Sequence, residues 1–189
     1  DYAKAGMDRA RLERIKPRMQ HYADAGTVAG TVTLVMRRGE LVHLEAAGWQ
    51  DVEAKKPMRT DTIFQIMSMT KPVTGGAVMM MVEEGKLRLA DPVEKHLPEF
   101  RGQLMVESRD GDRVVLKKPS RPITIRDLMT HTSGLIANPQ PGIGELLRNM
   151  DRTLAEAVSI YAQSPLEFEP GTKWMYSNPG IATLGRLVE

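Results

Sequence analysis

Residues 64–73, from Phe64 to Val73, constrain this chain more than any other stretch. A short apolar run, predicted to be strand-like, enters the stretch, and a long apolar run continues from Val73 to Val82. Pro72 supports a helix start here, because proline is tolerated in the first turn of a helix, where few backbone N–H groups have partners. We therefore predict that a helix begins at Ser68. Its apolar residues cover nearly every face, so we expect it to be buried.

Ser68 and Lys71 form an S-x-x-K pair at this helix start. Side chains at i and i+3 on a helix are neighbours, so the amine can reach the hydroxyl. The positive end of the helix dipole favours negative charge on the serine oxygen and disfavours charge on Lys71. A lysine desolvated there can act as a base and make the serine a nucleophile. The alternative interpretation is a serine N-cap followed by a solvated lysine, and the buried helix predicted next favours the catalytic interpretation.

Composition excludes several classes of function. The chain has 189 residues and 41% hydrophobic content, enough for one or two domains with a core. It has no cysteine, which excludes disulfides and thiolate chemistry. The net charge is +2 with both signs spread along the sequence, so we expect no nucleic-acid partner. No apolar run approaches the length of a membrane span, so we expect no membrane partner either.

Histidine spacing and the first residue bear on cofactors and location. The four histidines (His21, His43, His96 and His131) have no metal-ligand spacing, and we expect neither a metal nor another cofactor. The lack of cysteine leaves the compartment open. We expect a cytoplasmic location. The chain starts at Asp1 rather than Met, so a signal peptide upstream, with a periplasmic or secreted protein, stays an alternative.

The first part of the chain predicts one helix and one hairpin. Residues 3–24 have the pattern of an amphipathic helix that covers a sheet. The runs from Val28 to Met36 and from Leu41 to Gly48 flank Arg38-Gly39 and predict an antiparallel hairpin. Two or three strands make a marginal sheet. We therefore expect the remaining strands to come from polypeptide beyond Glu189.

The rest of the chain is predicted to be largely helical. Gly85 has the position of a glycine just after the central helix. Residues 104–116 predict a second hairpin folded about Asp110-Gly111. Further helix starts are predicted, in chain order, at the capping residues Asp91, Thr124, Thr153 and Asn178.

Residues 169–178 form a second stretch with chemical potential. A Pro170-Gly171 turn leads to Tyr176-x-Asn178, which can place a phenol and an amide near the Ser68 pair. A nearby ammonium lowers the pKa of a phenol, so Tyr176 can accept the serine proton and later return it to a leaving group. The alternatives are an N-cap role for Asn178 and an interfacial tyrosine, and the residues alone leave this open.

Three motifs in this order resemble the serine β-lactamase and penicillin-binding-protein superfamily: Ser68-x-x-Lys71, residues 123–135 with His131-Thr132-Ser133-Gly134, and Tyr176-Ser177-Asn178. The Tyr-x-Asn form is similar to the class C β-lactamase branch, shared with D-aminopeptidase-type hydrolases and family VIII carboxylesterases. The resemblance implies an α+β, β-lactamase/transpeptidase-like fold: an antiparallel sheet flanked by helices plus a mostly helical domain. It implies that only the N-terminal portion is present, with residues 1–66 in the α/β domain and 67–189 in the helical domain.

The resemblance also implies the site. Ser68 is the expected nucleophile, Lys71 its activating partner, Tyr176 the general base and acid, and Asn178 a support for Lys71 or the substrate. The Ser68 backbone N–H is expected to be one oxyanion-hole donor, with the second donor beyond residue 189. The family's third motif, Lys-Thr-Gly or His-x-Gly, does not follow Asn178. Ser133 with His131 is a rival nucleophile, disfavoured because it lacks a flanking glycine of a nucleophile elbow and because His131, two residues away, is expected to point elsewhere.

These roles predict a serine hydrolase that acts through a Ser68 acyl-enzyme on a small-molecule ester or amide. We favour a carboxylesterase for short-chain esters. The alternatives are a class C-like β-lactamase, a D-amino-acid peptidase or amidase, and, in another class, a non-catalytic penicillin-binding sensor or scaffold. The motifs are common to the three hydrolases and do not choose among them. We expect the 189-residue chain to be inactive without a C-terminal portion.

Overall fold

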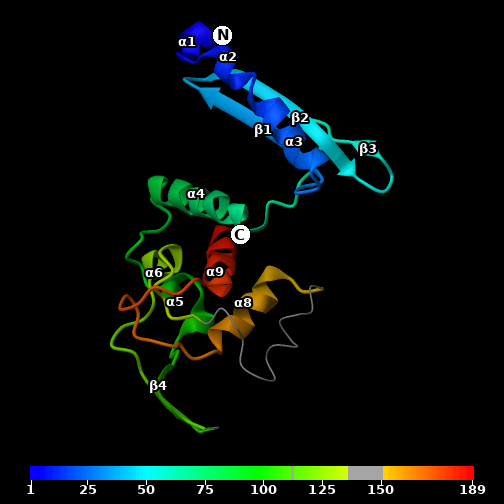
Figure 1. The fold of residues 1–189 in the computed structure, drawn as a ribbon. Coiled ribbons are helices and arrows are strands. Elements are labelled where there is room, and N and C mark those ends of the chain that lie inside the picture. Colours follow the sequence, from blue (N-terminus) through cyan, green and yellow to red (C-terminus); the bar gives the residue numbers. More distant parts are fainter. Residues whose placement is uncertain (112, 136–150) are drawn as a thin grey trace. The chain divides into compact units, whose positions relative to one another are not determined.

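The computed structural model describes residues 1–111, 113–135 and 151–189 (Figure 1). The chain divides into two compact units, Asp1–Gln65 (unit 1) and Ile66–Glu189 (unit 2). This boundary lies one residue before the expected one. Unit 1 combines helices with a sheet, and unit 2 is mostly helical with one hairpin.

Unit 1 begins with three short helices: α1 (Tyr2–Ala5), α2 (Arg9–Leu12) and α3 (Ile15–Asp24). The prediction of a single helix over residues 3–24 was therefore wrong. Gly6 ends α1 in a left-handed conformation with φ of 62°, and the Asp8 carboxylate accepts the Arg11 N–H to start α2. These capping signals outweigh the helical periodicity that continues across them.

The sheet of unit 1 has three antiparallel strands in the order β1 (Gly30–Arg37), β2 (Glu40–Asp51) and β3 (Lys56–Pro57). Arg38 and Gly39 join β1 to β2 with φ values of 52° and 76°. Two left-handed residues are what a tight hairpin turn requires, and the predicted hairpin is confirmed.

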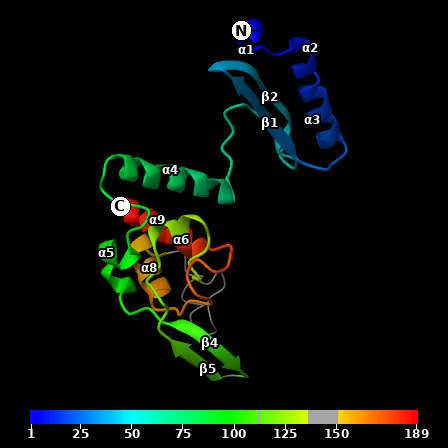
Figure 2. The same cartoon turned by 90° about the vertical axis from the view of Figure 1, so that its left-hand side faces the viewer.

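Helix α3 packs on β1 and β2 (Figures 1 and 2). Gly48 of β2 permits this approach, because a Cβ there would lie 2.7 Å from the Ala23 Cβ and 2.6 Å from the Ala29 carbonyl oxygen. The Gly48 N–H also donates to Gln20 Oε1 at 3.2 Å, which ties α3 to β2. A small apolar core of Ala5, Leu12 and Val42 completes unit 1.

The core of unit 2 surrounds its last helix, α9 (Asn178–Val188). Helices α4 (Thr70–Glu83), α6 (Ile125–Met129) and α8 (Leu154–Ala162) all contact α9 (Figures 1 and 2). Val78 of α4, Leu128 of α6 and Leu184 of α9 are fully buried. The helix that begins beside Ser68 and the helix that follows Tyr176 therefore belong to one packed body.

The shorter elements of unit 2 are α5 (Val93–His96), η2 (Pro98–Phe100) and the hairpin of β4 (Met105–Asp110) and β5 (Arg113–Lys117). The hairpin prediction is confirmed, and its last pair is Asp110 with Arg113; residue 112, inside the predicted stretch, lies outside the described residues. The capping boxes at Thr124 and Thr153 are confirmed as well.

Asp91 does not cap α5 as predicted, because the N-cap is Pro92. The Asp91 carboxylate instead accepts the backbone N–H of Arg88 and contacts the side chains of Lys95 and His96 at 2.9 and 3.0 Å. Lys95 first, and then His96, hold the pKa of Asp91 below its ordinary value. The carboxylate thus closes the turn before the helix and bonds to the side chains of Lys95 and His96 within it.

Helix α4 is not buried as expected. Val78 is its one buried residue, while Val73, Met79 and Met80 are 67%, 43% and 62% exposed. Its end is as predicted, with Gly85 at φ of 70° just after the helix. The described part of unit 2 covers only one flank of α4, although a helix apolar on all sides needs cover all round.

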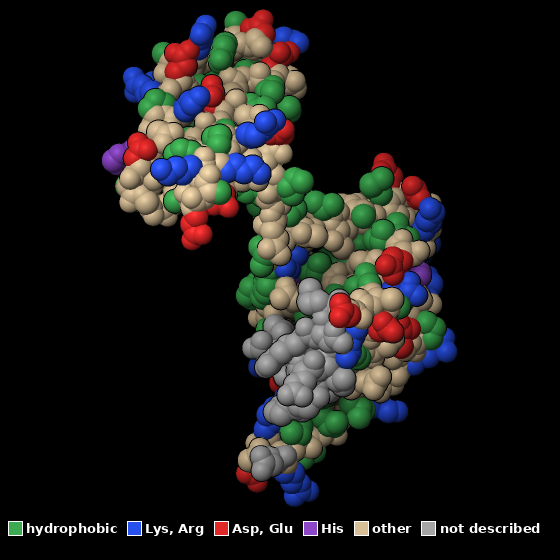
Figure 3. All heavy atoms as spheres, turned by 90° about the vertical axis from the view of Figure 1, so that its right-hand side faces the viewer, with side chains coloured by type: hydrophobic (Ala, Val, Ile, Leu, Met, Phe, Trp, Pro, Cys, Tyr) green, Lys and Arg blue, Asp and Glu red, His purple; other side chains and the backbone are tan. Residues whose placement is uncertain are grey.

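On the face in Figure 3, basic and acidic side chains are interspersed over both units. Within the described residues, no helix has the length and apolar character to cross a membrane. Among the same residues, no group of three or more His, Cys, Asp or Glu side chains is placed to hold a metal ion.

Candidate active site

The chain enters α4 through a turn that exposes Ser68. Residues 62–66, expected to be strand-like, belong to no strand among the described residues. Met67 has a left-handed φ of 49°, which is uncommon for a residue with a bulky side chain, and it opens the short 3₁₀ turn η1 (Met67–Met69). Helix α4 follows at once, with Pro72 in its first turn, so the predicted helix is present but begins at Thr70, two residues after Ser68.

Three predicted site residues meet at this turn. Lys71 Nζ donates to Ser68 Oγ at 3.0 Å, and Ser68 Oγ lies 2.6 Å from the phenol oxygen of Tyr176. The Lys71 ammonium also lies 4.7 Å from the centroid of the Tyr176 ring. Ser68 is exposed, and the other two side chains are half-buried. A hydroxyl, an amine and a phenol from distant segments thus form one hydrogen-bonded cluster, open to solvent at the serine.

The electrostatics of the cluster act mainly on the phenol. Lys71 first, and then the hydrogen bond with Ser68, hold the pKa of Tyr176 below its ordinary value. The cause is that a nearby ammonium and a hydroxyl donor both stabilise the phenolate more than the neutral phenol. Once ionised, this phenol, 2.6 Å from a serine hydroxyl, is placed to accept the serine proton.

The structure does not bring Asn178 into this cluster. Ser177 caps α9 with its Oγ, which accepts the Gly180 N–H at 2.9 Å, and Asn178 is already helical. The predicted N-cap role of Asn178 was therefore wrong by one residue. Its side chain is exposed and makes no hydrogen bond with the described residues, so its support of Lys71 or substrate stays a prediction.

His131 is a site residue that the sequence analysis missed. Its ring stacks on the Tyr176 ring, with centroids 4.9 Å apart and planes at 27°, and its Nδ1 accepts the Ser177 N–H at 3.1 Å. Trp174, which is 67% exposed, meets the His131 ring edge-on at 6.1 Å. The sequence signal was a histidine placed just after a capped helix, because histidine is enriched at left-handed positions. The structure gives His131 such a conformation, with φ of 58°.

Ser133 does not form a second nucleophile. Its side chain is fully buried, and its Oγ accepts the Leu135 N–H at 3.3 Å. Gly134 follows with φ of 79°, and a Cβ there would lie 2.6 Å from the Phe168 carbonyl oxygen. The stretch is therefore a tightly packed turn, and its histidine faces Tyr176.

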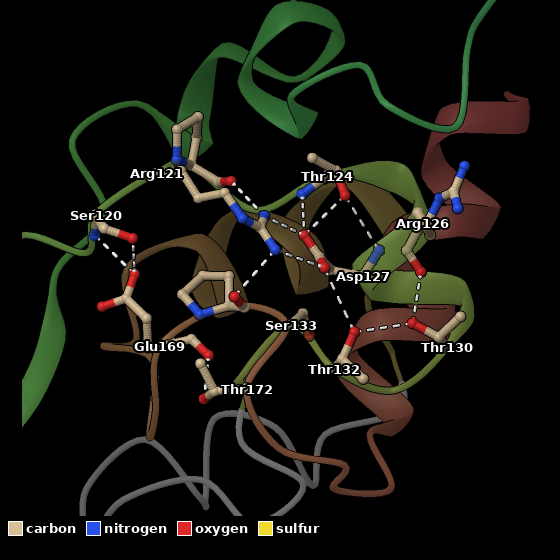
Figure 4. Close-up of polar contacts among 12 residues, drawn as sticks. Ser120, Arg121, Thr124, Arg126, Asp127, Thr130, Thr132, Ser133, Glu169 and Thr172 are labelled. Atoms are coloured by element: carbon tan, nitrogen blue, oxygen red, sulfur yellow. Dashed lines mark hydrogen bonds and ion pairs between the residues drawn. The ribbon is translucent and has the colours of Figure 1, made fainter.

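An ion pair between a half-buried arginine and a buried aspartate lies behind this turn (Figure 4). The Arg121 guanidinium donates to both oxygens of Asp127, at 2.6 and 3.0 Å, and also to the Pro170 carbonyl oxygen at 3.0 Å. Asp127 is 4% exposed and also closes the capping box with Thr124. Burial alone would raise the pKa of Asp127, but the hydrogen bonds from Arg121 and Thr124 outweigh it, and the pKa lies below its ordinary value.

The ion pair fastens the His131 turn to the segment that leads to Tyr176. The Thr132 N–H donates to the Asp127 carbonyl oxygen at 2.9 Å, and the Gly171 N–H donates to the Thr132 carbonyl oxygen at 2.8 Å. Further along, the Met175 N–H donates to the His131 carbonyl oxygen at 2.9 Å. Two chain segments are thus held side by side up to the residue before Tyr176.

The fold and this cluster are those of the β-lactamase superfamily. Residues 14–189 match the family model described as Beta-lactamase, so the chain belongs to that family. The predicted α+β, β-lactamase-like fold is confirmed, and the structures it resembles extend well beyond the matched part.

Three relatives show the degree of similarity. Esterase EstB of Burkholderia gladioli is 37% identical over 171 residues, covering 86% of this chain and 41% of EstB. Protein Rv1367c of Mycobacterium tuberculosis is 36% identical over 178 residues, covering 90% of this chain and 43% of that protein. The solved structure of EstCE1, a hydrolase with promiscuous acyltransferase activity, has a TM-score of 0.75 at 31% identity, covering 100% of this chain and 48% of EstCE1. The chain spans less than half the length of each.

Proposed function

We propose that this chain carries the nucleophile, its activating lysine and the general base of a carboxylesterase for short-chain esters. The observation that supports this most is the double contact of Ser68 Oγ, with Tyr176 at 2.6 Å and with Lys71 at 3.0 Å. Among the possible small-molecule substrates, similarity to Esterase EstB and to the hydrolase EstCE1 favours esters.

In the proposed acylation step, the Tyr176 phenolate accepts the Ser68 proton as Oγ attacks the ester carbonyl carbon. Lys71 stabilises the phenolate throughout. The Ser68 backbone N–H, at the start of η1, donates to the developing oxyanion. When the tetrahedral intermediate collapses, the Tyr176 hydroxyl returns the proton to the alkoxide that leaves. Ser68 then carries the acyl group.

In the proposed deacylation step, a water molecule takes the place of the alcohol. Tyr176 accepts a proton from the water as its oxygen attacks the acyl carbon, and the proton then returns to Ser68 Oγ as the acid departs. Asn178, whose amide is exposed at the first position of α9, is proposed to orient the substrate or Lys71. No step requires a metal or another cofactor.

The remaining parts of the site are proposed to lie in a C-terminal portion of the same protein. That portion would supply the second oxyanion-hole donor and the third motif, and it would cover the exposed flank of α4. The chain's coverage of less than half of each relative supports this view. We call the protein that carries residues 1–189 together with this portion the joined protein.

The test compares three substrates on the joined protein: p-nitrophenyl butyrate, a penicillin and D-phenylalanine amide. We expect turnover of the ester, its loss in Ser68→Ala by about 1,000-fold or more, and an acyl adduct on Ser68 by intact mass and peptide mapping. Ser108→Ala, an exposed serine in β4, is the matched control and should retain full turnover.

Other outcomes would favour the alternatives. Faster turnover of the penicillin or of the D-amino-acid amide would replace the carboxylesterase with the corresponding hydrolase. A stable penicilloyl adduct on Ser68 without turnover of any substrate would indicate a sensor. Full ester turnover by Ser68→Ala would contradict the proposed nucleophile.

A further inference from the structure

The segment that carries Tyr176 has no regular secondary structure of its own. Residues 173–177 lie between the Pro170-Gly171 turn and α9, outside any helix or strand. A tyrosine on such a segment can turn about its side-chain torsions unless neighbours hold it. The 2.6 Å contact with Ser68 therefore needs an explanation beyond the backbone path.

His131 meets this segment at successive residues. Its carbonyl oxygen accepts the Met175 N–H at 2.9 Å, and its Nδ1 accepts the Ser177 N–H at 3.1 Å. Between these two hydrogen bonds its ring lies against the Tyr176 ring at 4.9 Å, nearly parallel to it. The Trp174 ring meets the same imidazole edge-on. One residue thus fixes the backbone on both sides of Tyr176 and restricts its ring.

The hydrogen bond to Ser177 also fixes the protonation of His131. Nδ1 accepts an N–H, so it carries no proton, and a neutral imidazole then carries its proton on Nε2. Protonation of Nδ1 would set two N–H donors against each other and break the contact with Ser177. Burial first, and then the positive charge of Lys71, lower the pKa of His131, which keeps the ring neutral.

The ionisable groups that meet the ring are Lys71 of α4 and the Tyr176 phenol. The neighbouring pair of Arg121 and Asp127 bonds to Thr132 and Pro170 instead. That pair holds the turn in place from behind (Figure 4) without setting the charge of the imidazole.

We infer that His131 is a positioning residue that holds the Tyr176 phenol within hydrogen-bonding distance of Ser68, through its ring and its Nδ1. The inference rests on the proposed function, because it concerns the base of that reaction. His131 makes no contact with Ser68 among the described interactions and takes no proton from it. Its effect is on the geometry of proton transfer, where an error of about 1 Å can cost about 100-fold in rate.

Two variants of the joined protein separate the ring from the acceptor. His131→Phe keeps a flat ring but has no acceptor for the Ser177 N–H. His131→Asn keeps an oxygen near the position of Nδ1 and tolerates a left-handed φ, but it has no ring and does not titrate. We expect each to lower kcat for p-nitrophenyl butyrate about 10- to 100-fold and to leave KM within about twofold, because a base misplaced by about 1 Å slows proton transfer. His21→Asn, an exposed histidine in unit 1, is the matched control and should have wild-type constants.

The pH profile gives a readout that a merely structural role would not change. Below the titration of Tyr176 itself, wild-type activity should fall more steeply in a second acid limb as His131 becomes protonated, and this second limb should vanish in His131→Asn. Tyr176→Phe separates the two proposals. If Tyr176→Phe is inactive but both His131 variants have wild-type kcat, the inference about His131 is wrong and the proposed function stands. If Tyr176→Phe is fully active, the proposed base is wrong.

A measurement on the unmodified protein covers the case in which the variants misfold. Nitrogen NMR of isotope-labelled histidine reports the tautomer of each ring. Residues 1–189 contain four histidines, and single substitutions such as His21→Asn assign their signals. We expect the Nε2–H tautomer for His131. We also expect its ring to become protonated at the pH of the second acid limb, the limb that vanishes in His131→Asn. An Nδ1–H tautomer, or a protonated ring at the pH of full activity, would overturn the inference.

Discussion

At the scale of single residues, the reactivity of the site depends on what lies within bonding distance of one phenol. Lys71 and Ser68 both stabilise the Tyr176 phenolate, and His131 restricts its ring. The hydrogen bond from Lys71 is the larger of the two influences on the Tyr176 pKa. The charge and the ring contact can be altered separately by substitution.

Removing the ammonium tests the electrostatic part. Lys71→Met should raise the pKa of Tyr176 toward the ordinary value of about 10, because the phenolate loses its nearest positive charge. Tyr176 acts as a base in the proposed mechanism, so activity rises with pH through its pKa, and any residual activity of the variant should need a higher pH. The tyrosinate ultraviolet absorbance, after subtraction of the Tyr176→Phe signal, measures this pKa. Lys173 is an exposed lysine on the same segment, so Lys173→Met is the control and should leave the Tyr176 pKa unchanged. An unchanged Tyr176 pKa in Lys71→Met would contradict the electrostatic account.

The sequence predicted these contacts unevenly. Ser68 and Lys71 could be paired from spacing alone, because one helical turn fixes their separation. Tyr176 came from motif order, since no local rule joins residues so far apart. His131 was missed because its place in the sequence pairs it with its near neighbour Ser133. Its real partner follows from a turn at positive φ, which sequence spacing does not encode.

At the scale of elements, capping chemistry was more predictable than burial. The boxes that begin α6 and α8 follow from side chains three residues apart, and both formed. The single helix over residues 3–24 failed because Gly6 and Asp8 stop and restart it. The expected burial of α4 was wrong for another reason. Apolar composition indicates that a helix needs cover, but the elements packed against it determine how much of its surface is covered.

The Asp127 carboxylate joins capping to the site, and its loss should loosen α6. Asp127→Asn should lower the free energy of unfolding by about 2 kcal/mol at neutral pH, because hydrogen bonds to a charged group are lost. The pKa of Asp127 is lower in the folded chain, so its stabilisation is present above the unfolded-state pKa of about 3.9 and is lost as pH falls through the folded-state pKa. The difference in free energy of unfolding between the wild-type protein and Asp127→Asn should therefore become smaller as the pH falls. Circular dichroism melts across this pH range measure it.

The control for this prediction lies on the same helix. Arg126 is exposed, and its side chain makes no hydrogen bond among the described contacts, so Arg126→Gln should change stability little. A gap for Asp127→Asn that stays constant at all pH values would show that the carboxylate's charge is not what stabilises the turn.

At the scale of the whole molecule, the two units differ in what they contribute. All the contacts of the proposed site lie in unit 2, and unit 1 is a small helix-covered sheet with β1 at one edge. Edge strands and exposed apolar helix faces both favour association with other chains. The resemblance to the family implied a division at residue 66, and the clustering of contacts divides the chain at Gln65 and Ile66.

The isolated chain tests the proposed C-terminal portion. Residues 1–189 alone should show no turnover of p-nitrophenyl butyrate and should form aggregates in size-exclusion chromatography, because β1 and the exposed flank of α4 lack cover. Co-expression with the C-terminal portion should restore both activity and solubility, and the same pair with Ser68→Ala should restore solubility alone. Full turnover from the 189-residue chain would show that no further portion is needed.

The joint between the units falls at Gln65 and Ile66, three residues before Ser68. Only Ile66 and Met67 stand between that joint and the serine, and Met67 already has a left-handed backbone. The backbone of these two residues is the whole covalent connection between unit 1 and Ser68. With so short a connection, a change in the backbone of Ile66 or Met67 is expected to displace Ser68 Oγ relative to Lys71 and Tyr176.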